Sequence, residues 1–249
     1  MRKIVFMYHD VYSNSEKESG FQFVTSFPYK VDACKFEKQV KYAYDYCKKN
    51  NLPIETIEFT FDDGGVSFYT VIAPILEKYG FRGIFFISTS YINKDKFLTD
   101  EQIKSLHERG HIIASHSHTH PRNMTLLPAE EILQEWKTSI KILSDIIGAS
   151  VSVASIPCGF SSSELIDMAK KAGVTTLYTS IPTNGYMSYK SMELVGRYVI
   201  LCNTKDSKIC SIINSRRTRN LMYIRWKLIS LTKSLLGTYY NKIKNIIVR

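Results

Sequence analysis

Short apolar runs alternate with amphipathic stretches along most of this 249-residue chain, and this alternation limits the fold more than any other feature. The runs expected to form strands are segments 4–7, 56–61, 84–87, 111–115, 151–155 and 175–179. Strands that alternate with helices are typical of a mostly parallel sheet covered by helices. We therefore predict an α/β fold, either open or closed into a barrel, with its reacting groups at the carboxyl ends of the strands.

Helices are expected between these runs because apolar residues recur there at intervals of three or four. The expected helices cover residues 36–47, 68–79, 99–109, 132–147 and 163–172. Thr99 and Gln102 match a capping box, and Gly110 suits a left-handed position at the helix end. Pro74 falls within the helix expected at 68–79, so we predict a kink or a restart there.

The positive charge of this chain is concentrated near its C-terminus. The net charge is +10, and segment 208–249 holds ten lysine or arginine residues and no acidic residue. With 44% apolar residues, the composition is that of a folded globular protein rather than a disordered or membrane-spanning one. Since 249 residues suit one catalytic domain, we expect that domain at 1–205 and a basic helical extension at 206–249.

The N-terminal segment and the cysteines favour a cytoplasmic location. The apolar run after Arg2 and Lys3 is too short for the core of a signal peptide. The chain has no stretch of about 18 apolar residues, so no segment is expected to cross a bilayer. Its five cysteines are scattered and odd in number, which fits free thiols in a reducing compartment.

Three polar clusters directly follow three of the expected strands, so the fold should bring them to one edge of the sheet. The clusters are Asp62-Asp63, the run from His116 to His120, and Pro157-Cys158-Gly159. Adjacent aspartates at a strand end point in different directions, so one can ligate a cation while the other faces a water molecule. The alternative is an ordinary turn, because Asp-Asp-Gly-Gly is also common turn composition.

The histidine cluster is harder to assign to packing, because three histidines occupy alternate positions of the segment 116–120. His116 and His120 are four residues apart, so on one helical turn both imidazoles would reach a single ion. Together with one carboxylate of the Asp62-Asp63 pair they would form a set of two imidazoles and one carboxylate. We therefore predict a metal site made of His116, His120 and one of these aspartates.

The segments 60–64 (Thr-Phe-Asp-Asp-Gly) and 116–120 (His-Ser-His-Thr-His) resemble the first two motifs of the polysaccharide deacetylases with a NodB homology domain. The resemblance covers roughly residues 3–200, and lineages that act in surface-polysaccharide biosynthesis clusters are similar. It implies a distorted (β/α) barrel, one divalent metal and hydrolysis of an N-acetyl group on an amino sugar. The metal implied is zinc, with cobalt, manganese, iron and nickel as alternatives.

The resemblance also implies a role for each matching residue. Asp62 takes the position of the base, while Asp63, His116 and His120 take those of the metal ligands. Ser117 should orient the histidine loop. The loop that contains Pro157 should place the Cys158 backbone N–H as a donor to the developing oxyanion, and a nucleophilic Cys158 thiol is the less favoured alternative.

Two departures from the family pattern leave roles to be filled. Ser155 stands where many members have an arginine that orients the base, and we expect Arg197 either to replace that cation or to lie on the surface. All six histidines precede residue 121, so the late histidine that serves many relatives as general acid is missing. We expect His9 to act instead, with His118 or the protonated Asp62 as alternatives. Asp10 should hold His9 or line the sugar site.

Residues 216–249 are expected to form a basic amphipathic helix, interrupted near Gly237. Its apolar stripe and nearby cations are Leu221, Ile224, Leu228, Leu231, Leu235, Tyr239, Ile243 and Ile246, with Arg216, Arg217, Arg219, Arg225, Lys227, Lys233, Lys242 and Lys244. Such a helix either packs on its own domain or lies on an anionic membrane, here the inner face, where a lipid-linked glycan would be reached. No nucleic-acid recognition motif is present, so nucleic acid is not an expected partner.

The sequence thus predicts a metal-dependent carbohydrate de-N-acetylase whose partner is an N-acetylated carbohydrate. A catalytically silent barrel that binds a glycan or a biosynthetic partner is the main alternative, because of the missing arginine and late histidine. A hydrolase for a non-sugar amide would differ only in its pocket.

Overall fold

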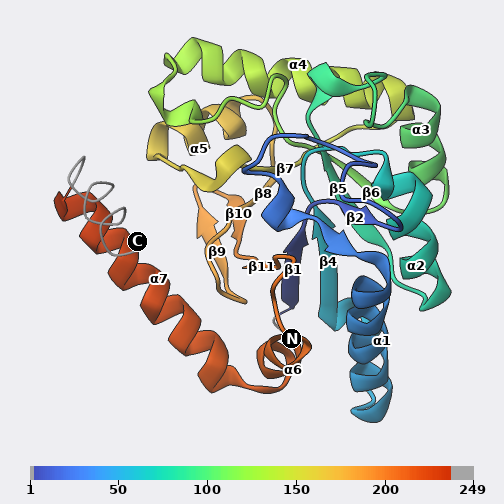
Figure 1. Ribbon diagram of the computed structural model, residues 1–249. Coiled ribbons are helices and arrows are strands. Elements are labelled where there is room, and N and C mark those ends of the chain that lie inside the picture. Colours follow the sequence, from blue (N-terminus) through green and yellow to red (C-terminus); the bar gives the residue numbers. More distant parts are fainter. Residues whose placement is uncertain (1–2, 237–249) are drawn as a thin grey trace.

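A single curved sheet forms the centre of the computed structural model, which describes residues 3–236 (Figure 1). Its strands are β1 (Ile4–Tyr8), β4 (Ile57–Phe61), β5 (Gly83–Ile87), β6 (Ile112–Ser115), β7 (Val153–Ser155), β8 (Thr176–Tyr178), β9 (Tyr186–Tyr189), β10 (Met192–Val195) and β11 (Tyr198–Val199). The spatial order is β11-β1-β4-β5-β6-β7-β8-β10-β9. Neighbouring strands run parallel except for the β10–β9 pair. The sheet curls into a half-barrel, which confirms the predicted fold class.

Helices cover the outer face of this sheet. They are α1 (Ala33–Lys49), α2 (Ala73–Lys78), α3 (Asp100–Glu108), α4 (Ala129–Ile147), α5 (Ser163–Lys171) and α6 (Asp206–Asn214), and a further helix, α7 (Arg216–Leu236), follows them. Figure 1 shows α1 to α5 arranged in chain order around the sheet, while α6 lies near the N-terminal end of β1. The fold therefore leaves the carboxyl ends of the strands to the loops.

The two faces of each strand contribute to different parts of the core. In β1, Phe6 and Tyr8 face the helices and join a large buried cluster with α1, α2 and α6. Val5, which directly precedes Phe6, faces the inside of the half-barrel, where it packs with Phe86 and Tyr178. Because side chains alternate along a strand, a sheet buried on both faces needs continuous apolar runs, and these are the runs seen in the sequence.

Several predicted boundaries are confirmed by the structure. Thr99 and Gln102 form a complete capping box at the start of α3, and Gly110 has the left-handed φ of +85° expected after its end. The helix expected at 68–79 begins as a short π-helix over Phe68–Ile72 and restarts as α2. Pro74 lies in the first turn of α2, where its missing N–H costs no helical hydrogen bond.

The expected extension 206–249 is divided in the structure. Helix α6 contributes Ile209, Ile212 and Ile213 to the same buried cluster as α1, so no break in packing occurs at residue 205. The chain then turns at Ser215 and continues as α7, which leads away from the body of the protein (Figure 1). The expected interruption at Gly237 and the cations Lys242 and Lys244 lie outside the described residues.

The short strands β2 (Val11–Tyr12) and β3 (Val31–Asp32) pair with each other and join the ends of the loop 13–30.

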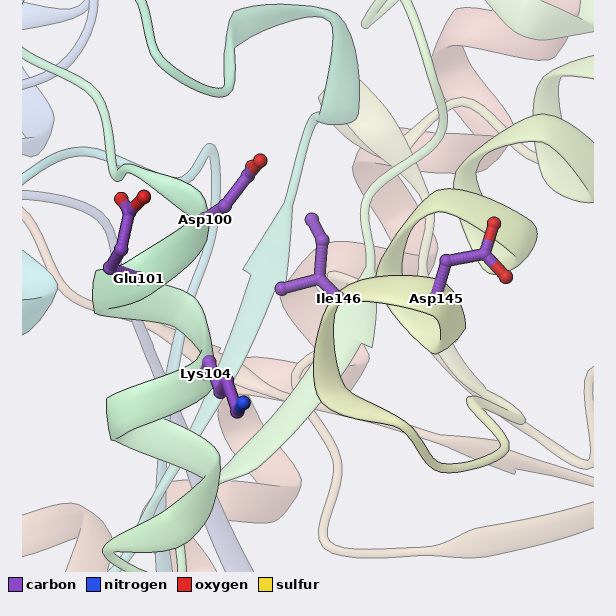
Figure 2. A pocket seen from close by; sticks show the side chains of 5 residues that line it. All are labelled: Asp100, Glu101, Lys104, Asp145 and Ile146. Atoms are coloured by element: carbon purple, nitrogen blue, oxygen red, sulfur yellow. The ribbon is translucent and has the colours of Figure 1, made fainter.

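A depression of about 410 Å³ lies between α3 and α4 on the outer helical layer, lined by Asp100, Glu101, Lys104, Asp145 and Ile146 (Figure 2). It is formed by other residues than the predicted site. No helix between residues 3 and 236 has the length and hydrophobicity needed to cross a membrane.

Candidate metal and catalytic site

The predicted site residues follow the ends of parallel strands, and backbone hydrogen bonds continue the sheet into the site. The Asp62 N–H donates to the Tyr8 carbonyl at the end of β1, and the His116 N–H donates to the Ile87 carbonyl at the end of β5. Pro157 follows β7 by two residues. These two backbone hydrogen bonds fix the chain where the aspartate pair and the histidine loop begin.

Asp63, His116 and His120 are brought together as the sequence predicts. The Asp63 Oδ1 atom lies 3.3 Å from His120 Nε2 and 3.6 Å from His116 Nε2. One ligand atom from each residue lies within 4.8 Å of the other two. Donor atoms at about 2.0–2.1 Å from a tetrahedral zinc ion are roughly 3.3–3.5 Å apart, so the set fits such an ion with modest adjustment.

Burial and neighbouring charge prepare His116 and Asp63 to act as ligands. The pKa of His116 is lowered to about 4, chiefly because burial disfavours the charged ring, so the imidazole is neutral near pH 7. Burial opposes ionisation of Asp63 as well, but the His9, His120 and His116 imidazoles outweigh it and hold the Asp63 pKa below its ordinary value. Burial also opposes the charged form of His120, but its hydrogen bond to Asp63 raises the His120 pKa above the ordinary value. Neutral imidazole and ionised carboxylate are the forms that bind metal.

The orientation of the His116 ring is set by Ser155. The His116 Nδ1 atom lies 3.1 Å from the Ser155 carbonyl oxygen and 2.6 Å from its hydroxyl oxygen. A carbonyl can only accept, so Nδ1 carries the proton and the Nε2 lone pair is free to bind a metal. The sequence identified Ser155 only as a departure from the family pattern, and nothing in the local sequence indicates this contact.

The histidines do not lie on a helical turn, so that part of the prediction is wrong. Residues 116–120 form an irregular loop in which Ser117 and His120 have left-handed φ values of +63° and +57°. The Ser117 hydroxyl accepts the His120 N–H at 3.2 Å, closing the loop on itself. His118 lies away from the ligand set, since its Nδ1 atom contacts the Thr89 hydroxyl at 2.9 Å. The two imidazoles converge because of this loop shape, and helical spacing is not needed.

Asp62 is paired with Arg197. Arg197 Nη1 donates to Asp62 Oδ1 at 2.6 Å, and Nη2 donates to Oδ2 at 2.8 Å. The guanidinium is fully buried, stacks 5.2 Å from the Phe86 ring centroid and also donates to the Thr179 carbonyl. Burial alone would raise the Asp62 pKa, but the Arg197 charge and hydrogen bonds hold it below the ordinary value. The structure therefore places a cation where the sequence lacks the family arginine.

His9 also lies at this edge, directly after β1. Its ring is 4.4 Å from that of Tyr29, and its charge is one of those that lower the Asp63 pKa. Among the residues that the structure describes, its buried Nδ1 atom has no hydrogen-bond partner. His9 is thus close to the predicted metal site and keeps a ring nitrogen available.

Asp10 does not hold His9, contrary to one of the sequence expectations. Its carboxylate accepts the Ser19 hydroxyl at 2.6 Å and the Ser67 hydroxyl at 2.9 Å. A Cβ atom at Gly20 or at Gly65 would come within 2.0 Å of an Asp10 oxygen, so glycines enclose this group. Burial raises the Asp10 pKa. Asp10 therefore joins the loop 13–30 to the loop after Asp63, a role that depends on contacts too distant in sequence to predict.

Cys158 lies in a tight turn with Pro157 and Gly159 beside the site. Its backbone is left-handed, with φ of +55°, while Pro157 is buried. Cys158 is exposed as a residue, but partial desolvation of its thiol and the nearby Asp63 carboxylate raise the pKa of that thiol. A thiol kept protonated is a weak nucleophile, which favours the interpretation that Cys158 contributes its backbone N–H.

Comparison with known proteins places this geometry in a family. The sequence profile of the polysaccharide deacetylase family matches residues 49–177, which include both the Asp62-Asp63 pair and the histidine loop. YxkH of Bacillus subtilis, itself named only provisionally as a polysaccharide deacetylase, is 25% identical over 192 residues, or 72% of this chain and 64% of YxkH. The peptidoglycan-N-acetylmuramic acid deacetylase PdaA of the same species is 29% identical over 140 residues, or 55% of this chain and 51% of PdaA.

The fold agrees with this sequence match. The Streptococcus pyogenes deacetylase PplD, solved in complex with acetate, superposes with a TM-score of 0.70 at 20% identity, covering 86% of this chain and 99% of PplD. The match spans less than two thirds of the length of the two curated relatives. Since the profile covers half of the chain, the chain belongs to the polysaccharide deacetylase family.

Proposed function

We propose that this protein hydrolyses the N-acetyl group of an amino sugar in a glycan or lipid-linked glycan precursor of surface-polysaccharide biosynthesis. The observation that carries the proposal is the pairing of Asp62 with Arg197 directly beside the Asp63, His116 and His120 set. A base fixed next to three metal ligands is the arrangement that metal-assisted amide hydrolysis requires. It also weakens the case for a silent barrel, which rested partly on the missing arginine.

A divalent metal, with zinc as the first choice, fits the three ligands proposed here. When bound, it supplies polarisation of the acetyl carbonyl and of the attacking water. Asp62 is not among these proposed ligands, because Arg197 donates a hydrogen bond to each of its two carboxylate oxygens. Its Oδ2 atom lies 3.9 Å from His116 Nε2, so it borders the same space as the ligands.

In this proposal Asp62 accepts a proton from the water molecule while the water oxygen adds to the acetyl carbon. The Cys158 N–H donates to the oxygen that becomes negative, with Pro157 and Ser117 shaping the two loops. When the carbon–nitrogen bond breaks, His9 gives a proton to the leaving amine, and acetate and the free amino sugar are the products. His9 is suited to this step because it lies beside the site with one ring nitrogen unpartnered.

The direct test is acetate release from N-acetylated oligosaccharides by the purified, zinc-loaded protein and by Asp62→Asn. The variant keeps the size of the side chain but cannot accept a proton, so we expect its rate to fall by about 10²–10⁴. Metal content should stay unchanged in this variant, because Asp63 is the proposed ligand. Equal rates in both proteins would remove Asp62 as the base, and a metal-loaded wild type inactive on all glycans would favour the binding barrel.

We also propose that α7 attaches the protein to an anionic membrane, with the inner face as the expected one. The apolar residues Leu221, Ile224, Leu228 and Leu231 share one stripe of α7 and are 57%, 52%, 59% and 51% exposed. Arg225 and Lys227 flank this stripe on its two sides by helical spacing. Packing of this stripe on the domain, the other expectation, is absent among the residues that the structure describes.

Co-sedimentation with vesicles tests this attachment. We expect binding to vesicles that contain phosphatidylglycerol, weak binding to pure phosphatidylcholine, and release at high salt. Leu228→Glu should abolish binding, whereas the matched control Ser230→Glu adds the same charge on an exposed position outside the stripe and should lower binding only slightly. Equal losses in the two variants would show that the apolar stripe does not enter the bilayer.

A further inference from the structure

The carboxylate of Glu135, on α4, is directed at the loop that carries both predicted histidine ligands. Its Oε2 atom accepts the backbone N–H groups of His118 and Thr119, each at 2.8 Å. Its Oε1 atom accepts the Thr119 hydroxyl at 2.6 Å. One side chain from a distant helix thus makes three hydrogen bonds to two of the three residues between His116 and His120.

This loop has no regular secondary structure, so hydrogen bonds from other elements hold it, namely those of Glu135 and of two backbone N–H groups in the segment 89–90. Ser117 and His120 both adopt left-handed φ values, which are unfavourable for residues other than glycine. The segment has no helical or strand hydrogen bonds of its own between these positions. An ionised acceptor makes shorter and stronger hydrogen bonds than a neutral one, so Glu135 suits the task better than a neutral side chain would.

The helix that presents Glu135 is itself fixed to the sheet. Trp136 is completely buried, and the Ser139 hydroxyl accepts a hydrogen bond at 2.8 Å from Ser115, the last residue of β6. Within residues 3–236 Glu135 forms no salt bridge with a lysine or arginine. Its charge is therefore directed to the loop.

We propose that Glu135 is a positioning residue that holds the loop 116–120 in the shape that binds metal, and so sets the metal affinity. The inference rests on the proposed function, because it assumes that His116 and His120 are ligands. Removing the Glu135 charge should let the loop relax to more favourable φ values and separate the two imidazoles. Partners behind metal ligands commonly change affinity by 10–100-fold when they are removed.

The test compares Zn²⁺ affinity in wild type, Glu135→Gln and Glu131→Gln by competition with a chromophoric chelator. Glu131 is an exposed residue one turn earlier on α4, so its variant makes the same charge change away from the loop. We expect Glu135→Gln to bind Zn²⁺ about 10–100-fold more weakly and Glu131→Gln to stay within about twofold.

A second measurement, thermal unfolding of the metal-free proteins, separates positioning from general stability. A Glu135→Gln protein that unfolds at a lower temperature but keeps the wild-type Zn²⁺ affinity would overturn the proposal. So would equal losses of affinity in the two variants. A wild type that binds no Zn²⁺ would instead contradict the proposed function, so the two failures are distinguishable.

Discussion

Arg197 and Asp62 are 135 residues apart in the chain, yet two hydrogen bonds of 2.6 and 2.8 Å join their side chains in the interior. We predict that Arg197→Lys lowers the rate of acetate release by at least about tenfold, because an ammonium cannot hold both carboxylate oxygens. Arg197→Ala should also destabilise the fold by about 3–5 kcal/mol, since it leaves a buried charge unpaired. Urea unfolding and steady-state kinetics would measure both effects.

The pH dependence of the Arg197→Lys variant gives a further check on this pair. Arg197 holds the Asp62 pKa below its ordinary value, so weaker pairing should raise that pKa. Less of the base is then ionised at a given acidic pH, and the acid limb of the rate profile should move to higher pH. An unchanged acid limb would indicate that another group sets it.

Loss of His9 should affect the chemical step without loss of metal. We expect His9→Gln to lower kcat by about 10²–10⁴, the usual range for a general acid. Zinc content, measured by elemental analysis, should remain at the wild-type level because His9 is not a proposed ligand. A variant that keeps full activity would transfer the acid role to Asp62 after it has accepted the water proton.

Substitution of Cys158 distinguishes its backbone from its thiol. Cys158→Gly keeps the N–H and readily adopts the observed φ of +55°, so we expect it to retain activity within about tenfold. A nucleophilic thiol would make the same change nearly abolish activity. Cys158→Ala provides a second readout, since it too lacks the thiol but retains some strain at this φ.

Metal binding should stabilise the fold and should depend on the two histidines. At a zinc concentration 100 times the dissociation constant, we expect about 2.7 kcal/mol of added stability. His116→Ala and His120→Ala should each lose both the bound metal and most of this stabilisation. Thermal unfolding with and without zinc, together with elemental analysis, tests the site. Undiminished stabilisation by zinc in either variant would exclude the substituted histidine as a ligand.

Because His111 is buried, we expect the stability of the metal-free fold to depend on pH. Its Nδ1 atom accepts the Gly83 N–H and its Nε2–H donates to Glu77, both at 2.9 Å, so the ring must be neutral to keep both bonds. Burial lowers the His111 pKa in the folded state, despite the opposing Glu77 charge. As pH falls below about 6.5 the unfolded chain takes up this proton first, so stability is lost.

The corresponding experiment compares unfolding free energies of wild type and His111→Asn between pH 7.5 and pH 5. The difference between them should change with a slope of up to about 1.4 kcal/mol per pH unit, with the wild type losing more as pH falls. A difference that does not vary with pH would show that His111 does not titrate differently in the two states.

The sequence by itself determined those features that depend on neighbouring residues. Apolar periodicity placed the strands and helices, the capping box defined the start of α3, and Pro74 marked the restart at α2. The Asp62-Asp63 pair and the histidine loop were predicted as one site because parallel strands end at a shared edge. These predictions succeed because hydrogen bonding and side-chain alternation within a segment are local.

Only the tertiary structure decided the relations that join distant segments. The Arg197 pairing, the Ser155 contact to His116 and the support of the loop by Glu135 each link residues 16 to 135 positions apart. The enclosure of Asp10, the irregular path of 116–120 and the exposed stripe of α7 likewise depend on which surfaces meet. A side chain's partner across the fold is set by the packing of whole elements, and no local pattern encodes it.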